Sequence, residues 1–370
     1  MKIERAEIHH ICLPMNIPFV TACGTITNRN LLIIRIFTEG IVGLGECCAN
    51  VDPIYSPETI KGCRHIIKDF ILPALLGKEF NSVDEFSAAM NHVVGNHMAK
   101  SAVELAFWDI MSRKKGVSIS SLLGGTKTRV EAGVSVGMFD TFEDTLHEAR
   151  VQLSKGFTRL KVKIQPGHDV ELVSYLRKHL GDIQLMADAN SSYSLKQADM
   201  LQALDPFGLT QLEQPLESDD IVDHAALQKT LRTPICLDES VVHARAARQA
   251  IHLGACRIIN VKLSRVGGLL KAKRIHDICE KTGTGLWCGS MLESGVGMMY
   301  NIIYSSLPGV NYPGDIQESC HYMSDDIVEP MIDVSGDGTF AVPAEPGIGV
   351  SLNWEKMSRY LVSTEVLRPS

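Results

Sequence analysis

Five charged residues recur along the middle of this chain at almost equal intervals, and each lies at the end of a short apolar run. They are Lys163, Asp188, Glu213, Asp238 and Lys262, so the intervals are 25, 25, 25 and 24 residues. About 25 residues is the length of one strand plus one helix, and eight such units close into a barrel with its active site at the carboxyl ends of the strands. An open sheet would bring only the strands beside its switch point to one ligand. The spacing therefore predicts an α/β chain built on a TIM-type barrel.

The sequence pattern divides the chain into three parts. Residues 1–125 mix strand-like and helical runs, which predicts an α+β domain in front of the barrel. Residues 126–330 carry the alternating strands and helices of the barrel, and residues 331–370 are predicted to pack back on the first domain.

Two segments of the first domain carry clearer signals. The stretch "HMAKSAVELAFWDIMSRKKG" predicts a helix with one apolar stripe, which ends at Gly116 after a basic last turn. The stretch "FVTACGTITNRN" is rich in small and hydroxyl residues and contains Gly24, which predicts a mobile loop.

Composition narrows the class of partner. The formal net charge of the 370 residues is −7, and no run of lysines or arginines interrupts the mixture of signs. This argues against a nucleic acid or a membrane surface as partner and favours a small molecule. The ten cysteines are scattered without a C-x-x-C pair, which predicts buried thiols in a reducing compartment. The start "MKIERAEIHHICLPM" lacks the apolar core of a signal peptide, so a cytoplasmic protein is expected.

The three acidic residues of the series predict a metal site. Asp188, Glu213 and Asp238 would repel one another at one barrel mouth unless a cation lay between them. Ligands that are all oxygen select a hard ion, so Mg²⁺ is the expected cofactor, with Mn²⁺ as the alternative. The competing interpretation, in which these acids are solvated strand ends or ion-paired with the lysines, explains their regular spacing less well.

The lysines lie on both sides of these acids. In "LKVKI", Lys161 and Lys163 alternate with apolar residues and therefore share one face of a strand, whereas Lys262 follows the last acidic strand. A lysine beside another cation can have its pKa lowered until it serves as a general base. Bases on opposite faces of a metal-bound carboxylate predict removal of the α-proton, with Mg²⁺ stabilising the enediolate. A lone lysine would instead be read as a snorkelling surface side chain.

These residues resemble the muconate-lactonizing subgroup of the enolase superfamily, whose barrel carries K-x-K, three acidic metal ligands and a further lysine. Similarity over nearly the whole chain, in "PFVTACGT", "PIYSPET", "SLLGG", "MLESGVG" and "VPAEPGIGV", points to its branch of o-succinylbenzoate synthases and N-succinylamino acid (N-acylamino acid) racemases. The resemblance implies a modified (β/α)7β barrel with an N-terminal α+β capping domain. It also implies a homo-oligomer, a small carboxylate substrate, and a role in menaquinone synthesis or in amino acid conversion.

The resemblance assigns roles to individual positions. Lys163 and Lys262 would be the acid/base catalysts, and Asp188, Glu213 and Asp238 would hold Mg²⁺. Substrate-binding or supporting roles are implied for Lys161, Asn190, Glu239, Arg265, Ser290, Met291, Glu293 and Thr25. For Arg265, an ion pair or an ordinary arginine near a helix start is the alternative.

Two departures leave the substrate open. The usual "GGMLE" is "GSMLE" here, so Ser290 replaces a glycine, and "PGDI" continues as "QESCHY" where small residues are common. A dipeptide epimerase would need an acidic or similar partner for the substrate's ammonium. The resemblance associates that activity with a D-x-D after the last barrel strands, where this chain has "SMLES" instead. A muconate cycloisomerase is less favoured by the overall resemblance. A Schiff-base aldolase would not need three metal-binding acids, and a non-catalytic protein would be expected to lose some of the five ionisable residues.

Overall fold

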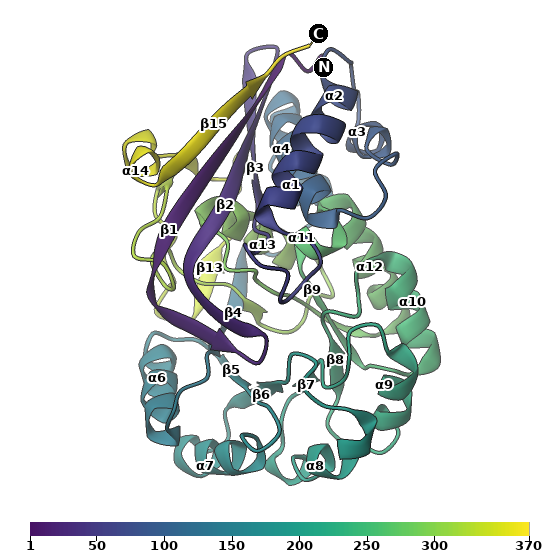
Figure 1. Cartoon of the computed structure of the whole chain (residues 1–370), viewed down its shortest axis with the longest axis vertical. Coiled ribbons are helices and arrows are strands. Elements are labelled where there is room, and N and C mark those ends of the chain that lie inside the picture. The colour runs from purple at the N-terminus through teal and green to yellow at the C-terminus, as the bar shows by residue number, and fades with distance from the viewer. Residues whose placement is uncertain (370) are drawn as a thin grey trace.

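The structure is a computed structural model, and it describes residues 1–369. Its first layer is an antiparallel sheet in the order β15-β1-β2-β3. The strands are β1 (Arg5–Thr21), β2 (Gly24–Thr38), β3 (Ile41–Cys47) and β15 (Leu361–Leu367). Figure 1 shows β15 beside β1, so that both ends of the chain meet at the top of the molecule, while the β1–β2 hairpin reaches down to the barrel.

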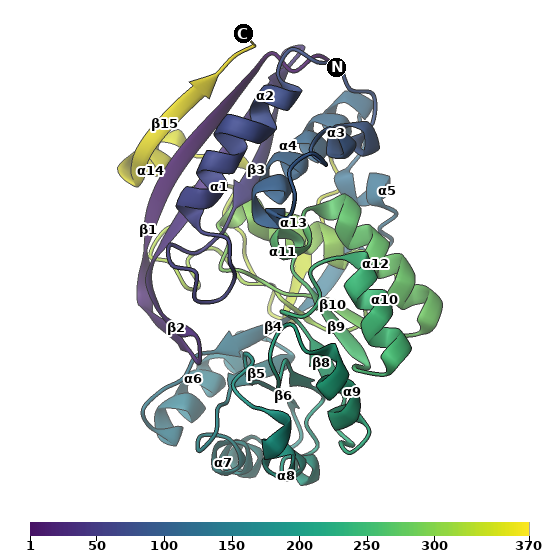
Figure 2. The same cartoon turned by 45° about the vertical axis from the view of Figure 1, so that its right-hand side comes forward.

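Helices pack on one face of this sheet (Figure 2). They are α1 (Ile60–Ile66), a π-helical turn (Ile67–Ile71), α2 (Leu72–Leu75), α3 (Val83–Ala89), α4 (His97–Lys115) and α5 (Ile119–Leu123). The predicted long helix is confirmed as α4, and Gly116 ends it in the left-handed conformation with φ 68°.

The single apolar stripe predicted for α4 is wrong, because polar residues such as Glu104 and Asp109 are buried as well. The helix lies between the sheet and the barrel and has almost no exposed side. Its approach to β3 is very close: a Cβ added to Gly45 would lie 2.0 Å from the carbonyl oxygen of Ala102. Glycine is therefore required there for α4 to pack on the sheet.

The segment "FVTACGTITNRN", predicted to be a loop, is instead the end of the β1–β2 hairpin. Pairs such as Phe19 with Ile26 and Val20 with Thr25 continue the ladder to its tip. Aromatic and β-branched residues such as these favour extended backbone, which outweighs the loop signal of Gly24.

The second unit is the barrel, whose parallel strands follow one another in the order β10-β9-β8-β7-β6-β5-β4-β11. The strands are β4 (Arg129–Val136), β5 (Arg159–Lys163), β6 (Gln184–Asp188), β7 (Leu212–Glu213), β8 (Ile235–Leu237), β9 (Ile258–Val261), β10 (Gly285–Cys288) and β11 (Gly314–Asp315). Backbone N–H groups of Asn311 and Tyr312 donate to the carbonyl of Leu286, which draws the start of β11 to β10.

Helices follow the first seven barrel strands, so the expected (β/α)7β architecture is confirmed. They are α6 (Phe142–Ser154), α7 (Val170–Leu180), α8 (Ala198–Gln202), α9 (Ile221–Gln228), α10 (Ala244–Leu253), α11 (Leu263–Val266), α12 (Leu269–Thr282) and α13 (Gly295–Ser305). Short 3-10 turns, Leu195–Gln197 and Asp205–Phe207, flank α8.

The last part of the chain contacts both units. It contains β12 (Val328–Glu329), β13 (Thr339–Ala341), β14 (Ser351–Leu352), α14 (Trp354–Arg359) and β15. Strand β13 pairs antiparallel with β4 of the barrel, whereas β15 pairs with β1 of the first sheet. Within residues 1–369, no helix combines the length and the apolar character needed to cross a membrane.

Candidate active site

A cavity lies where the β1–β2 hairpin meets the carboxyl ends of the barrel strands. The barrel contributes three lysines to its wall, and the capping sheet and the loop that follows it contribute mainly apolar and aromatic groups. These are Lys161, Lys163 and Lys262 from the barrel and Phe19, Ile26, Ile54 and Tyr55 from the capping part. The position matches the end at which barrels of this kind build their sites.

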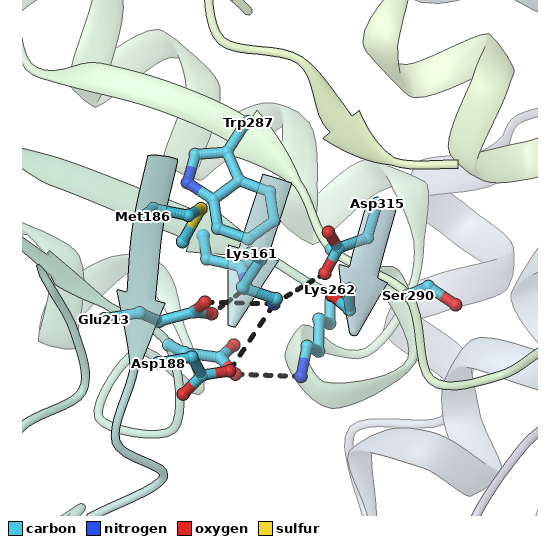
Figure 3. A network of polar contacts seen from close by, with 12 residues as sticks. Lys161, Met186, Asp188, Glu213, Lys262, Trp287, Ser290 and Asp315 are labelled. Carbon is cyan, nitrogen blue, oxygen red and sulfur yellow. Dashed lines mark hydrogen bonds and ion pairs between the residues drawn. The ribbon is translucent and has the colours of Figure 1, made fainter. Parts of the chain in front are cut away.

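Both lysines of "LKVKI" point into the barrel, as the alternation predicts. Lys161 is buried with its Nζ 2.6 Å from Asp315 Oδ2, 3.0 Å from Glu213 Oε2 and 3.5 Å from Asp188 Oδ2, as Figure 3 shows. Burial opposes the charge of Lys161, but these carboxylates hold its pKa well above the ordinary value. Lys161 is therefore a fixed cation that ties three strands together.

Lys163 lies two residues after Lys161 on β5, nearer to the mouth of the barrel. Its Nζ is 2.6 Å from Asp188 Oδ2 and donates to Asn190 Oδ1 at 2.8 Å. Asn190 in turn donates from Nδ2 to Glu239 Oε1 at 3.0 Å, so the two predicted supporting residues lie in one chain of contacts. Asn190 has a positive φ of 41°, a conformation that asparagine tolerates better than most residues.

Lys262 approaches the same acids from β9. Its Nζ lies 2.8 Å from Asp238 Oδ2 and donates to the Tyr55 hydroxyl at 2.7 Å. Arg265 contacts Asp238 from the first turn of α11 and donates to the same hydroxyl at 2.9 Å. Arg265 thus lies beside the second lysine, as predicted, and forms an ion pair with Asp238.

Burial and charge act in opposite directions on the pKa of Lys262. Burial lowers the pKa of Lys262, but the Asp238 carboxylate outweighs burial and raises it above the ordinary value.

The three acids stand at the ends of the adjacent strands β6, β7 and β8. Burial and the neighbouring charge of Asp188 raise the pKa of Glu213 to about 8. Burial also acts on Asp188, yet the Lys163 and Lys161 ammonium groups hold the pKa of Asp188 below its usual value. Negative charge is therefore crowded at Glu213.

The donor set fits a hard divalent cation. Its atoms are carboxylate oxygens, and the buried Glu239 Oε2 beside them has no hydrogen-bond partner. The oxygens of Asp188, Glu213 and Asp238 do not gather within 4.8 Å of one another. Each of the three acids is instead in contact with a lysine ammonium group.

The loop after β10 holds the other predicted residues. The hydroxyl of Ser290 donates to Glu293 Oε2 at 2.7 Å and accepts from the backbone N–H of Leu292 at 2.9 Å. Met291 also donates its N–H to Glu293 at 2.8 Å, and its side chain is buried. Ser290 and Met291 line the cavity, whereas Glu293 supports the loop from behind. The hydroxyl that replaces the family's glycine is thus turned into its own loop.

The substrate-binding or supporting role implied for Thr25 does not agree with its position in the structure. It is exposed and lines a separate surface hollow, while Thr21, Cys23 and Ile26 of the same hairpin line the cavity. Side chains alternate across a strand, so a one-residue difference turns Thr25 to the opposite face from Ile26.

Sequence reasoning missed several residues of the site. Asp315, inside the motif "PGDI", closes the eighth barrel strand and binds both Lys161 and Arg159. Following the strand-end rule past Lys262 would have found it. Tyr55 lies 207 residues from Lys262 along the chain, in the stretch "PIYSPET", which contributes to the family resemblance but was given no role in the site.

Comparison with known proteins places this architecture and site in one family. The model of the mandelate racemase / muconate lactonizing enzyme N-terminal domain matches residues 5–124, and the enolase C-terminal domain-like model matches residues 144–356. The chain belongs to the mandelate racemase / muconate lactonizing enzyme family of the enolase superfamily.

Relatives narrow the position within the family. The chain is 45% identical to an o-succinylbenzoate synthase of Bacillus subtilis over 99% of this chain and 98% of that protein. It is 42% identical to an N-succinylamino acid racemase of Thermus thermophilus over 95% of each chain. A solved enolase-superfamily structure from Listeria innocua superposes with a TM-score of 0.96 at 38% identity, covering 100% of this chain and 99% of the other.

Proposed function

We propose that this protein removes the proton α to a carboxylate of a small substrate, as an o-succinylbenzoate synthase, an N-succinylamino acid racemase, or an enzyme with both activities. The observation that carries the proposal is the placement of two lysines in one cavity. Lys163 on β5 and Lys262 after β9 both line it, and the three strands between them carry Asp188, Glu213 and Asp238. A substrate carboxylate held at the acids would place its α-carbon between two proton-transfer groups.

The acids would hold Mg²⁺, with Mn²⁺ as the alternative. When bound, the divalent cation would supply positive charge that stabilises the second negative charge which the substrate carboxylate gains as an enediolate. Lys161, fixed by Glu213 and Asp315, adds a permanent cation on the same side. The chain's own contribution is therefore two cavity lysines on either side of three consecutive acidic strand ends.

Racemisation follows if both lysines take part. A neutral lysine amine on one face accepts the α-proton and becomes an ammonium, and the ammonium of the other lysine delivers a proton to the opposite face. Tyr55 and Arg265 hold the Lys262–Asp238 side of this exchange in place. This activity is supported by the similarity to the Thermus thermophilus racemase.

Synthase activity needs one lysine as base. Lys163 would accept the α-proton and become an ammonium, and the electron pair left behind would form a double bond as hydroxide leaves the β-carbon. The Lys163 ammonium would return its proton to the hydroxide, which leaves as water. This alternative is supported by the similarity to the Bacillus subtilis synthase. A dipeptide epimerase or a muconate cycloisomerase of the same family is the less supported reading.

The test is proton NMR in D₂O with purified protein, Mg²⁺ and a panel of N-succinylamino acids, with the o-succinylbenzoate precursor assayed in parallel. Loss of the α-proton signal that stops when a chelator is added supports the two-lysine mechanism. Dehydration of the precursor with an unchanged α-proton signal restricts the protein to synthase activity. No reaction with either compound contradicts the proposal. A homo-oligomeric state and a cytoplasmic location stay predictions.

A further inference from the structure

The capping-domain helix α4 presents two buried polar side chains to the barrel. Ser101 and Glu104 are both fully buried, and because they lie three residues apart they share one face of the helix. The Ser101 hydroxyl donates to the carbonyl of Leu263 at 3.2 Å. The Glu104 carboxylate accepts from the backbone N–H groups of Leu269 and Leu270, each at 2.9 Å. Two polar groups of the capping domain therefore bind the segment that follows barrel strand β9.

That segment consists of the short helix α11 and the turn that joins it to α12. Helix α11 begins directly after Lys262, which is its N-cap residue. The turn Gly267–Gly268 that ends α11 has positive φ values of 92° and 108°. A Cβ added to Gly268 would clash with the Glu104 carboxylate, so the turn packs directly on this side chain. Ser101 and Glu104 therefore hold α11 at both of its ends.

Helix α11 in turn sets the position of the Lys262 side of the cavity. Arg265 on α11 donates from Nη2 to the carbonyl of Asn260 at 3.0 Å, and its Nη1 forms the ion pair with one oxygen of Asp238. Lys262 Nζ lies 2.8 Å from the other oxygen of Asp238. A shift of α11 would therefore move Arg265 and Lys262 together relative to this acid.

The Lys163 side of the cavity is held in another way. Lys163 contacts Asp188 at 2.6 Å, at the end of the neighbouring strand β6, and Asn190 at 2.8 Å, two residues further on. Asn190 is held by Glu239, which follows β8. These contacts join barrel residues to one another and do not pass through α4. The two lysines therefore depend on different parts of the chain.

The donors that surround Glu104 are neutral N–H groups. Besides the two backbone donors of α12, the indole Nε1 of Trp108 donates to the carboxylate at 3.0 Å. Burial raises the pKa of Glu104 to about 7, so the group is largely ionised at pH 8. A carboxylate at a helix start is favoured by the helix dipole and accepts strong hydrogen bonds. Glutamine has the same shape but would place an N–H₂ group against one of these N–H donors.

The geometry points to Ser101 and Glu104 as positioning residues for Lys262, through which α4 controls proton transfer on one face of the substrate and leaves the other face to Lys163. The inference rests on the proposed function for the two faces of the substrate. It goes beyond that function by assigning the stereochemical balance of the reaction to a helix behind the cavity wall. The physical reason is that a general base or acid must lie within hydrogen-bond reach of the carbon it serves, so a small displacement of one lysine lowers only its own proton transfer.

The test uses four variants of α4 in two matched pairs. Glu104→Gln and Ser101→Ala weaken the contact with the barrel. Asp109→Asn and Ser112→Ala are the controls, since both residues are equally buried but contact the capping domain. The carboxylate of Asp109 accepts from the N–H of Leu44 on β3 at 3.0 Å. The hydroxyl of Ser112 donates to the carbonyl at position 117, just beyond the end of α4, at 2.6 Å.

Two measurements are made on each variant. α-Proton exchange in D₂O at pH 8 is followed separately on the L- and D-forms of one N-succinylamino acid, and the enantiomer that Lys262→Ala no longer exchanges is assigned to Lys262. The ¹³Cε NMR signals of Lys262 and Lys163, in protein labelled at lysine and assigned with Lys262→Arg and Lys163→Arg, report the surroundings of both lysines without turnover.

Glu104→Gln should lower exchange of the enantiomer assigned to Lys262 about tenfold and change exchange of the other less than about twofold. Ser101→Ala should lower the same exchange about threefold, because the Leu263 carbonyl keeps the N–H of Gly268 as donor. The Lys262 signal should shift in both variants and the Lys163 signal in neither. In the two controls, both rates and both signals should stay as in the wild type.

Equal losses on both enantiomers with shifts at both lysines would make Ser101 and Glu104 general supports of the fold and overturn the inference. An unchanged Lys262 signal in Ser101→Ala and Glu104→Gln would overturn it as well. If Glu104→Gln does not fold, Ser101→Ala decides by the same measurements. A selective shift of the Lys262 signal in a protein that acts neither on these compounds nor on the o-succinylbenzoate precursor would uphold the positioning and contradict the proposed function. Exchange of both enantiomers with no shift of that signal would do the reverse.

Discussion

The two sides of the barrel mouth differ in kind. From β5 to β9 every strand end carries a charge, and each lysine there touches a carboxylate. From β10 through β11 to β4, the residues that line the cavity include the uncharged Ser290, Gln317 and Ser135. Asp315 also lines this side, and its carboxylate forms ion pairs with Arg159 and Lys161. The two sides therefore differ in charge: the side from β5 to β9 carries the ionisable strand ends, and the side from β10 to β4 lines the cavity mainly with uncharged groups.

The largest expected effect comes from the charged side. Lys163→Ala should reduce racemisation or dehydration about a thousandfold, because a positioned general base contributes on the order of 10² to 10⁴ in rate. Steady-state kinetics with the best substrate of the panel measure it. Lys196→Ala, on an exposed position, is the control and should react at the wild-type rate. A loss below tenfold for Lys163→Ala would remove this residue from the chemistry.

The next effect tests the ion network that joins the two sides. Asp315→Asn should lower the free energy of unfolding by about 3 kcal/mol, because Arg159 and Lys161 would be left buried without their shared carboxylate. Urea unfolding measures the change, with the exposed Asp337→Asn as control. If the two variants unfold alike, Asp315 does not join the walls as described.

A smaller effect is expected from the capping loop. Tyr55→Phe removes the hydroxyl that accepts from Lys262 and Arg265 and donates to Asp238 at 2.9 Å. Hydrogen bonds to charged groups are worth about 1.5 to 3 kcal/mol, so kcat should fall at least tenfold while KM changes much less. Tyr175→Phe, whose hydroxyl contacts Glu143 on the outside of the barrel, serves as control. A change confined to KM would make Tyr55 a substrate contact instead.

The last prediction is a pH dependence of stability, and it concerns Glu46, which supports the start of α13. Glu46 accepts from the N–H groups of Ser294 and Gly297 at the start of α13, and burial raises its pKa from 4.5 to about 8. The folded protein therefore holds a proton that the unfolded chain has lost between these pH values, and stability falls as pH rises through this window.

The slope is at most about 1.4 kcal/mol per pH unit. In Glu46→Gln this contribution is absent, so the wild type should lose stability relative to the variant from pH 4.5 to about 8. Unfolding free energies at both ends of the window measure it. A constant difference between the two proteins would show that Glu46 does not titrate there.

The charged side could be predicted from the sequence because it repeats. A strand followed by a helix has a nearly constant length in the barrel, so the charged strand ends recur at an almost constant spacing and can be recognised from it. These residues are Lys163, Asp188, Glu213, Asp238 and Lys262. The family resemblance added Asn190, Glu239 and Arg265, and the structure brings all three into contact with these groups or with one another.

The capping-domain contacts and the neutral side could not be predicted in the same way. Tyr55 meets Lys262 only through the packing of the capping domain on the barrel, and Thr25 was misplaced because the face of a strand depends on a register that spacing does not reveal. Ser135 and Gln317 are ordinary polar residues in the sequence. Their burial, with Ser135 Oγ and Gln317 Oε1 lacking a hydrogen-bond partner, is seen only in the three-dimensional structure.

The central claim is that Lys163 and Lys262 act on opposite faces of one substrate carbon. It is tested most directly by α-proton exchange in D₂O, measured separately on the L- and D-forms of one N-succinylamino acid with Lys163→Ala and with Lys262→Ala. Each variant should exchange one enantiomer and leave the other unchanged, and the two variants should choose opposite enantiomers. Loss of exchange on the same enantiomer in both variants, or exchange of both enantiomers by either one, would contradict the account.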